Sequence, residues 1–100
     1  AGGPVHAETS ARIVVENRTY SALAVAVVDS AGRERRIGNV PPDFVNTLFV
    51  GEPLPAGPAR LLARVAGEDE ELYRSNPIQL RPGMTLRWKL PSNAVEIAGE

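Results

Sequence analysis

The chain contains no cysteine and only one histidine among its 100 residues. The absence of cysteine excludes a disulfide scaffold, a thiolate metal ligand, a thiol nucleophile and a lipid anchor on a residue of this chain. The single histidine, His6, lies in a predicted arm, so a catalytic triad or a histidine-based metal cluster cannot form within one chain. The sequence therefore predicts a protein that is not an enzyme, with no catalytic residue, metal site or cofactor.

Aromatic residues are also scarce, at 5% of the chain. No window approaches the roughly 18 uninterrupted apolar residues that a membrane-spanning helix requires. The formal net charge of −1 at pH 7 provides no field that would draw the chain onto nucleic acid. We therefore expect no nucleic-acid partner and no transmembrane segment within this chain.

The sequence does contain a series of short apolar runs separated by glycine, proline, asparagine and aspartate. Runs of this length with alternating polarity indicate β-strands. Strands are predicted at residues 11–16, 20–28, 33–40, 44–50, 59–66 and 84–90. A further strand, at 72–75 and 78–80, is interrupted at Asn76-Pro77, and a short terminal strand is predicted at 95–97. The predicted fold is a single antiparallel β-sandwich of about seven or eight strands, immunoglobulin-like or transthyretin-like, at residues 11–98, with an N-terminal arm at 1–10.

Alternation within the runs predicts which side chains face the core. Residues 20–28 carry leucine and valines on one side and alanines on the other, so this strand should lie centrally in a sheet with its alanine side closely covered. Trp88 is predicted to be the largest core side chain. Residues 44–50 are ambiguous because both sides are apolar, and we expect Val45, Thr47 and Phe49 to point inward.

Three groups of charged residues are candidates for a shared surface, two of them local in the sequence and one spread over two predicted strands. The run from Glu68 to Glu71 offers oxygen ligands for Ca²⁺, but consecutive carboxylates in a turn point in different directions and are predicted to be solvated. The basic residues Arg33, Arg35 and Arg36 are predicted to form one patch, and Arg60, Arg64, Arg87 and Lys89 a second across two strands on one exposed face. Charges of this kind are typical of a solvated sheet face that resists aggregation.

Four segments resemble small exported bacterial β-sandwich proteins that mostly lack an assigned function. These segments are Ile13 to Asn17, Arg36 to Val40, Ala59 to Ala63 and Arg81 to Leu86. Many proteins of this kind are lipoproteins, whereas this chain has no cysteine to carry a lipid. The resemblance implies an exported β-sandwich and no catalytic residues.

The functional hypothesis is a non-enzymatic, exported protein–protein interaction module, an accessory subunit docked on a larger envelope or membrane protein complex. The segment Val5-His6-Ala7 has the small-x-Ala form of a signal-peptidase site, which favours a periplasmic or secreted location. Expected contact surfaces are the unpaired sheet edges, the arm with Gly2, Gly3, Pro4 and Val5, and the loop at 51–58 with Pro53, Leu54 and Pro55. The alternative is a β-sandwich that binds a small ligand or a carbohydrate.

Overall fold

The computed structural model describes residues 10–51, 54–92 and 94–99. Within these residues the chain forms eight strands and no helix. The strands are β1 (Ala11–Asn17), β2 (Leu23–Val28), β3 (Glu34–Val40), β4 (Phe44–Val50), β5 (Arg60–Val65), β6 (Glu71–Arg74), β7 (Thr85–Leu90) and β8 (Val95–Gly99). No described segment is a helix with the length and apolarity needed to cross a membrane.

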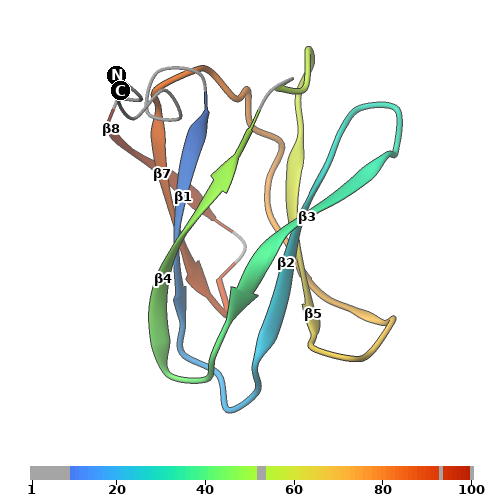
Figure 1. The fold of residues 1–100 in the computed structure, drawn as a ribbon, viewed down its shortest axis with the longest axis vertical. Coiled ribbons are helices and arrows are strands. Elements are labelled where there is room, and N and C mark those ends of the chain that lie inside the picture. The colour runs from blue at the N-terminus through green and yellow to red at the C-terminus, as the bar shows by residue number, and fades with distance from the viewer. Residues whose placement is uncertain (1–9, 52–53, 93, 100) are drawn as a thin grey trace, which may run out of the picture.

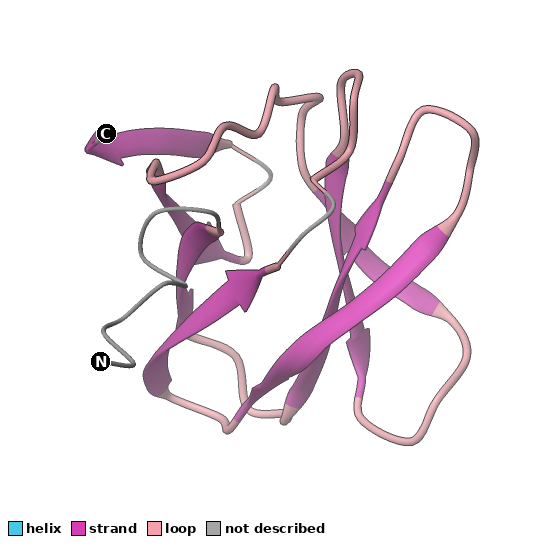
Figure 2. Cartoon of the chain, turned by 45° about the horizontal axis from the view of Figure 1, so that its top comes forward, coloured by secondary structure: helices cyan, strands magenta, loops and turns pink. Residues whose placement is uncertain are grey.

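The strands form two four-stranded sheets that pack face to face, in the orders β4-β1-β7-β8 and β3-β2-β5-β6 (Figure 1). All neighbours are antiparallel except β1 and β7, which run parallel. Figure 2 shows loops and turns, and no helix, between the strands of the described part of the chain. The predicted all-β sandwich is confirmed, although the parallel pairing of β1 with β7 departs from the predicted antiparallel arrangement. Most strands lie near their predicted bounds, but β2 begins at Leu23, and the strand portion predicted at 78–80 is wrong because Ile78 forms only an isolated bridge with Ala59.

The core lies between the sheets and is built from alternate residues of the central strands. Ile13 and Val15 of β1 and Leu86 and Trp88 of β7 are fully or almost fully buried. In the facing sheet, β2 contributes Leu23, Val25 and Val27, and β5 contributes Leu61 and Ala63. The central position predicted for β2 and the core position predicted for Trp88 are confirmed.

The prediction for β4 is wrong: Val45, Thr47 and Phe49 face outward. The reason is the register with β1, which pairs Ile13 with Leu48 and Ala11 with Val50. Because directly paired residues lie on the same face of a sheet, Leu48 and Val50 join the core with Ile13. The side chains of Leu48 and Val50 are buried, whereas those of Val45 and Phe49 are exposed.

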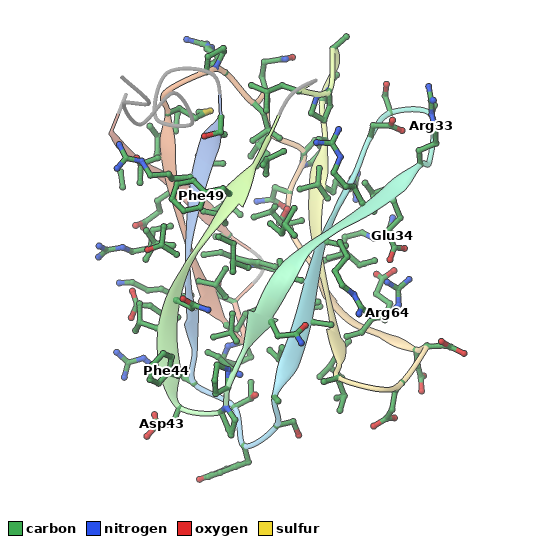
Figure 3. The ribbon with its side chains drawn as sticks, viewed as in Figure 1. Arg33, Glu34, Asp43, Phe44, Phe49 and Arg64 are labelled. Carbon is green, nitrogen blue, oxygen red and sulfur yellow. The ribbon has the colours of Figure 1, made fainter. Side chains whose placement is uncertain are left out.

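The alanine side of β2 is buried although none of the described strands forms a further layer over it. Ala24 and Ala26 are under 10% exposed. Arg64 on β5 pairs with Ala24 across the sheet, Glu34 on β3 pairs with Val28, and the guanidinium and the carboxylate meet in a two-pronged ion pair over β2 (Figure 3). The short alanine side chains leave room for this bridge, and the predicted close cover is confirmed.

The predicted second basic patch does not form. Arg60 and Arg64 lie on β5 in one sheet, and Arg87 and Lys89 lie on β7 in the other. Their side chains alternate with core residues, so the two pairs project from opposite faces of the sandwich. Arg87 approaches Glu16 at 3.8 Å, where Arg18 also binds the carboxylate at 3.3 Å.

The Glu34–Arg64 bridge makes the stability of the fold depend on acidity. The hydrogen bond from Arg64 lowers the pKa of Glu34 below its usual value of 4.5, against a smaller opposing effect of burial. A carboxyl group whose pKa is lower in the folded state stabilises the fold above its unfolded pKa, and this contribution is lost as the pH falls through the folded pKa. We expect Glu34→Gln to lower the melting temperature at neutral pH, and the difference from the parent to close below pH 4.5.

Melting curves recorded from neutral to acid pH test this expectation. Glu70→Gln is the matched control, because Glu70 lies in the exposed turn and has no ion pair among the described residues. It should follow the parent at every pH. A difference between parent and Glu34→Gln that stays constant with pH would contradict the assigned role.

One buried polar side chain, that of Asn17 at the end of β1, organises a corner of the fold. Its Nδ2 group lies 2.8 Å from the carbonyl oxygen of Ser21, 3.1 Å from that of Val40 and 3.0 Å from that of Pro41. Its Oδ1 atom accepts hydrogen bonds from the backbone N–H and the hydroxyl of Thr19. The turn after β1 is thus fixed to the end of β3 in the opposite sheet and to the connection that leads from β3 to β4.

Candidate functional site

Of the residues predicted to contact a partner, Leu54 and Pro55 belong to the part of the chain that the structure describes. Gly2, Gly3, Pro4, Val5 and Pro53 lie outside the described residues. Leu54 and Pro55 are described and half-buried, and Leu54 packs against the edge of the core. Leu54 therefore has a structural role as part of the loop between β4 and β5.

Leu54 and Pro55 line an open hollow of about 420 Å³ at the end of the β2–β3 hairpin. The opposite wall carries Asp29, Arg33, Glu34 and Arg35. These charges are largely engaged with one another and with the backbone: the Asp29 carboxylate accepts hydrogen bonds from two backbone N–H groups of its own turn and lies 3.6 Å from Arg33. No aromatic side chain lines the hollow, so it lacks the stacking platform of a typical carbohydrate site.

The acidic turn at 68–71 is tied to arginines. The backbone carbonyl of Asp69 accepts a hydrogen bond from Arg64 at 2.8 Å, and the carboxylate of Glu71 forms a two-pronged pair with Arg74 at 2.8 and 2.9 Å. That pair raises the pKa of Arg74. Among the described residues no group of three or more histidine, cysteine, aspartate or glutamate side chains is arranged to hold a metal ion.

The most distinctive exposed surface is β4, an edge strand of the sheet β4-β1-β7-β8. The side chains of Val45 and Phe49 are 54% and 49% exposed, and Phe44 at the start of the strand is 54% exposed. Figure 3 shows Phe44 and Phe49 toward opposite ends of β4. Large exposed apolar side chains grouped on one strand mark a surface suited to contact with another molecule.

Backbone hydrogen bonds show which groups of β4 face away from the sheet. The N–H group of Arg12 on β1 bonds to the carbonyl group of Met84, just before β7, and that of Arg18, just after β1, bonds to the carbonyl group of Leu90 at the end of β7. The backbone N–H and C=O groups of even-numbered residues of β1 therefore point toward β7, and those of odd-numbered residues point toward β4. Since odd-numbered residues of β1 pair with even-numbered residues of β4, the N–H and C=O groups of Val45, Thr47 and Phe49 point to the unpaired side of the strand.

We call the unpaired side of β4, with the side chains and backbone groups of Val45, Thr47 and Phe49, the β4 edge. The same three residues thus present apolar or uncharged side chains on the sheet face and backbone groups at its border. A strand added here would gain both main-chain hydrogen bonds and side-chain contacts.

The other edge strands carry features that discourage pairing with a further strand. β3 carries Glu34, Arg35 and Arg36 and has a bulge in its pairing with β2. β6 has four residues and is followed by Asn76 and Pro77, and β8 has five residues with Glu96 among them. β4 has seven residues, none of them charged. Among the described strands, β4 is the edge least protected by charge, shortness or distortion.

Two side chains partly occupy the β4 edge. Asn46 accepts a hydrogen bond from the Thr47 N–H at 3.1 Å and donates one to the Asn39 carbonyl of β3, also at 3.1 Å. Arg35 donates a hydrogen bond to the carbonyl oxygen of Gly51, just beyond the strand, at 2.9 Å. Between them, the backbone groups of Val45 and Phe49 and the carbonyl of Thr47 have no strand partner in the pairing register.

The sequence contained a signal for this site that our prediction did not use. Residues 44–50 carry no charge in a chain with 23% charged residues. In the structure they form an edge strand of their sheet and not a central one. An uncharged run is ordinary for a central strand, so only the strand order reveals that it is an exposed edge.

Comparisons with known proteins bear on the fold alone. No family model matches the chain, and no curated protein matches it. The chain is similar to the NMR structure of a protein from Eubacterium rectale, with a TM-score of 0.52 and 13% sequence identity, over 100% of this chain and 97% of that one. At this identity the likeness shows a shared arrangement of strands.

Proposed function

We propose that the chain is a non-enzymatic protein–protein interaction module that takes up an extended segment of another polypeptide along the β4 edge. The observation that carries this proposal is that Val45, Thr47 and Phe49 combine exposed side chains, two of them apolar, with backbone groups that lie outside the strand ladder. Main-chain hydrogen bonds would supply affinity, and contacts with alternate side chains would supply specificity. Such binding requires no reacting group.

We further propose that the module acts in the periplasm or outside the cell, as an accessory subunit docked on a larger envelope or membrane protein complex. The segment Val5-His6-Ala7 and the resemblance to small exported β-sandwich proteins support this setting. An unpaired strand edge is a means of attachment to a larger assembly that a chain of this size can provide.

For the finer fold type, we propose the transthyretin-like over the immunoglobulin-like arrangement. In the immunoglobulin constant-type fold, the first and second strands belong to one sheet. Here β1 and β2 belong to different sheets, and β1 lies between β4 and β7. The strand order therefore favours the transthyretin-like alternative.

Binding of a small ligand or carbohydrate is the second candidate. It rests on the hollow of about 420 Å³ beside Leu54 and Pro55. The mutual engagement of the charges in that hollow and the absence of aromatic lining residues give this candidate less support than the β4 edge has.

Amide hydrogen exchange with a synthetic peptide tests the proposed function. The probe alternates valine and threonine over the length of β4, and a peptide of similar length with central prolines is its control. We expect the probe to slow exchange at Val45, Thr47 and Phe49, since these amides face the β4 edge, and to leave Asn46 and Leu48, whose amides face β1, nearly unchanged.

Thr47→Pro is the matched variant for this experiment. It removes an N–H group that does not belong to the ladder with β1, so an edge strand tolerates it. We expect the variant to fold and to lose the protection by the peptide. The proposed function fails if the probe protects none of the three amides in the parent, or if Thr47→Pro retains the protection.

A further inference from the structure

We propose that the strand received at the β4 edge is β4 of a second copy of this chain, paired antiparallel about a two-fold axis at Thr47. This inference rests on the proposed function, because it names the partner of the same edge. The pairing would join two four-stranded sheets into one continuous eight-stranded sheet, with β4 and its copy at the centre.

The side chains of β4 are self-complementary in this register. With Thr47 on the axis, Val45 of each copy lies opposite Phe49 of the other, and the two Thr47 side chains lie opposite each other. All three pairs consist of residues whose backbone groups face the β4 edge, so each pair exchanges both of its N–H···O hydrogen bonds. A phenylalanine facing a β-branched residue across two strands is a favourable pair.

The charges at the ends of β4 are complementary in the same register. Asp43, immediately before the strand, would lie opposite Gly51 of the second copy. In each chain the guanidinium group of Arg35 is held at the carbonyl oxygen of Gly51, at 2.9 Å. Each end of the paired strands would therefore bring an exposed carboxylate toward an arginine, while the strands contribute no like charges to repel each other.

The size of the contact predicts a weak dimer. One pair of strands with two apolar side chains from each copy buries less than the about 1,200 Å² at which standard protein interfaces begin. Pairing also requires Asn46 to release the N–H group of Thr47. We therefore expect association that depends on concentration, with half of the chains paired on the order of 100 μM.

Single cysteines test the register, because the parent chain has none. Opposing residues of a hydrogen-bonded antiparallel pair have Cα atoms about 5.5 Å apart, within the range of about 4.4–6.8 Å that a disulfide spans. Under mild oxidation we expect Thr47→Cys to form a covalent dimer with itself. Val45→Cys and Phe49→Cys should each form no covalent dimer alone, and they should form a mixed disulfide-linked dimer when the two variants are combined.

Tyr20→Cys is the matched control, because the side chain of Tyr20 is fully exposed and lies in the loop between β1 and β2, outside the β4 edge. It reports the cross-linking that random collision produces. Sedimentation equilibrium of the cysteine-free chain provides a second measurement: the average mass should rise with concentration, and Val45→Lys should abolish the rise. Leu72→Lys, a half-exposed position on β6, should leave it unchanged.

The outcomes separate this inference from the proposed function. A chain that remains monomeric at millimolar concentration, with Thr47→Cys cross-linking no faster than Tyr20→Cys, overturns the inference. If the valine–threonine peptide still protects the β4 edge, that edge binds a different polypeptide and the proposed function stands. If the peptide also fails to protect it, both fall.

Discussion

Trp88→Ala is expected to lower the free energy of unfolding by about 3–5 kcal/mol, the range for removal of a fully buried aromatic side chain. Trp88 has no exposed surface and lies between Val15 of β1 and Val95 of β8 across the sheet. Its Nε1–H group donates a hydrogen bond of 2.8 Å to the carbonyl oxygen of Ser92, so the ring also fixes the turn between β7 and β8. The loss is a large fraction of the about 5–15 kcal/mol that stabilises a typical domain.

Chemical denaturation followed by far-ultraviolet circular dichroism measures this effect, because the variant removes the chain's one tryptophan. Trp88→Phe should lose less, since it keeps an aromatic ring in the core and gives up the hydrogen bond to Ser92. Tyr20→Ala is the surface control and should change stability by less than about 0.5 kcal/mol. A loss below about 1 kcal/mol for Trp88→Ala would contradict the packing described for β7.

Asn17→Ala is expected to cost at least about 1–3 kcal/mol, the penalty for leaving a buried hydrogen-bonding group without a partner. The carboxamide of Asn17 is buried, and its Nδ2 group lies within hydrogen-bond distance of three carbonyl oxygens, in the β1–β2 connection, at the end of β3 and in the β3–β4 connection. Alanine removes these bonds together with those to Thr19, so the carbonyl groups of Ser21, Val40 and Pro41 each lose this donor. Denaturation midpoints of parent and variant provide the measurement.

Asn17→Asp distinguishes the hydrogen bonds from the volume of the side chain. A carboxylate of nearly the same shape would face three carbonyl oxygens, which disfavours its charged form and raises its pKa in the folded state. The variant should therefore be strongly destabilised at neutral pH and recover part of its stability as the pH falls through that raised pKa. This is the opposite sign to Glu34, whose carboxylate stabilises the fold. A variant as stable as the parent at neutral pH would show that the carbonyl contacts contribute little.

The sequence predicted the strands well because their signals are local. Turn residues bound each run, and in β1, β2, β5 and β7 only one face combines large apolar side chains in regular alternation. For β4 both faces are apolar with one polar residue each: Asn46 beside Leu48 on one face, and Thr47 beside Phe49 on the other. The choice between them depends on the register with β1, which is set by a partner distant in sequence.

The candidate site was beyond prediction for the same reason. The prediction of the second basic patch was wrong for this reason. Alternation shows that Arg64 and Arg87 point away from the core, but it does not show that their strands lie in different sheets. The strand order also determines that β4 is an edge. The ion pair between Glu34 and Arg64 could not be foreseen, since it joins two strands across a third.

The parallel pairing of β1 with β7 has a consequence for how the protein folds. Ile13 of β1 pairs with Leu86 of β7, so β1 cannot complete its pairing until five further strands and then β7 have been synthesised. Contacts between such distant segments make folding slow, because a large loop must close before the pair forms. A nascent chain that stops before β7 keeps both borders of the paired strands β4 and β1 open, and we expect it to be prone to aggregation until β7 is synthesised.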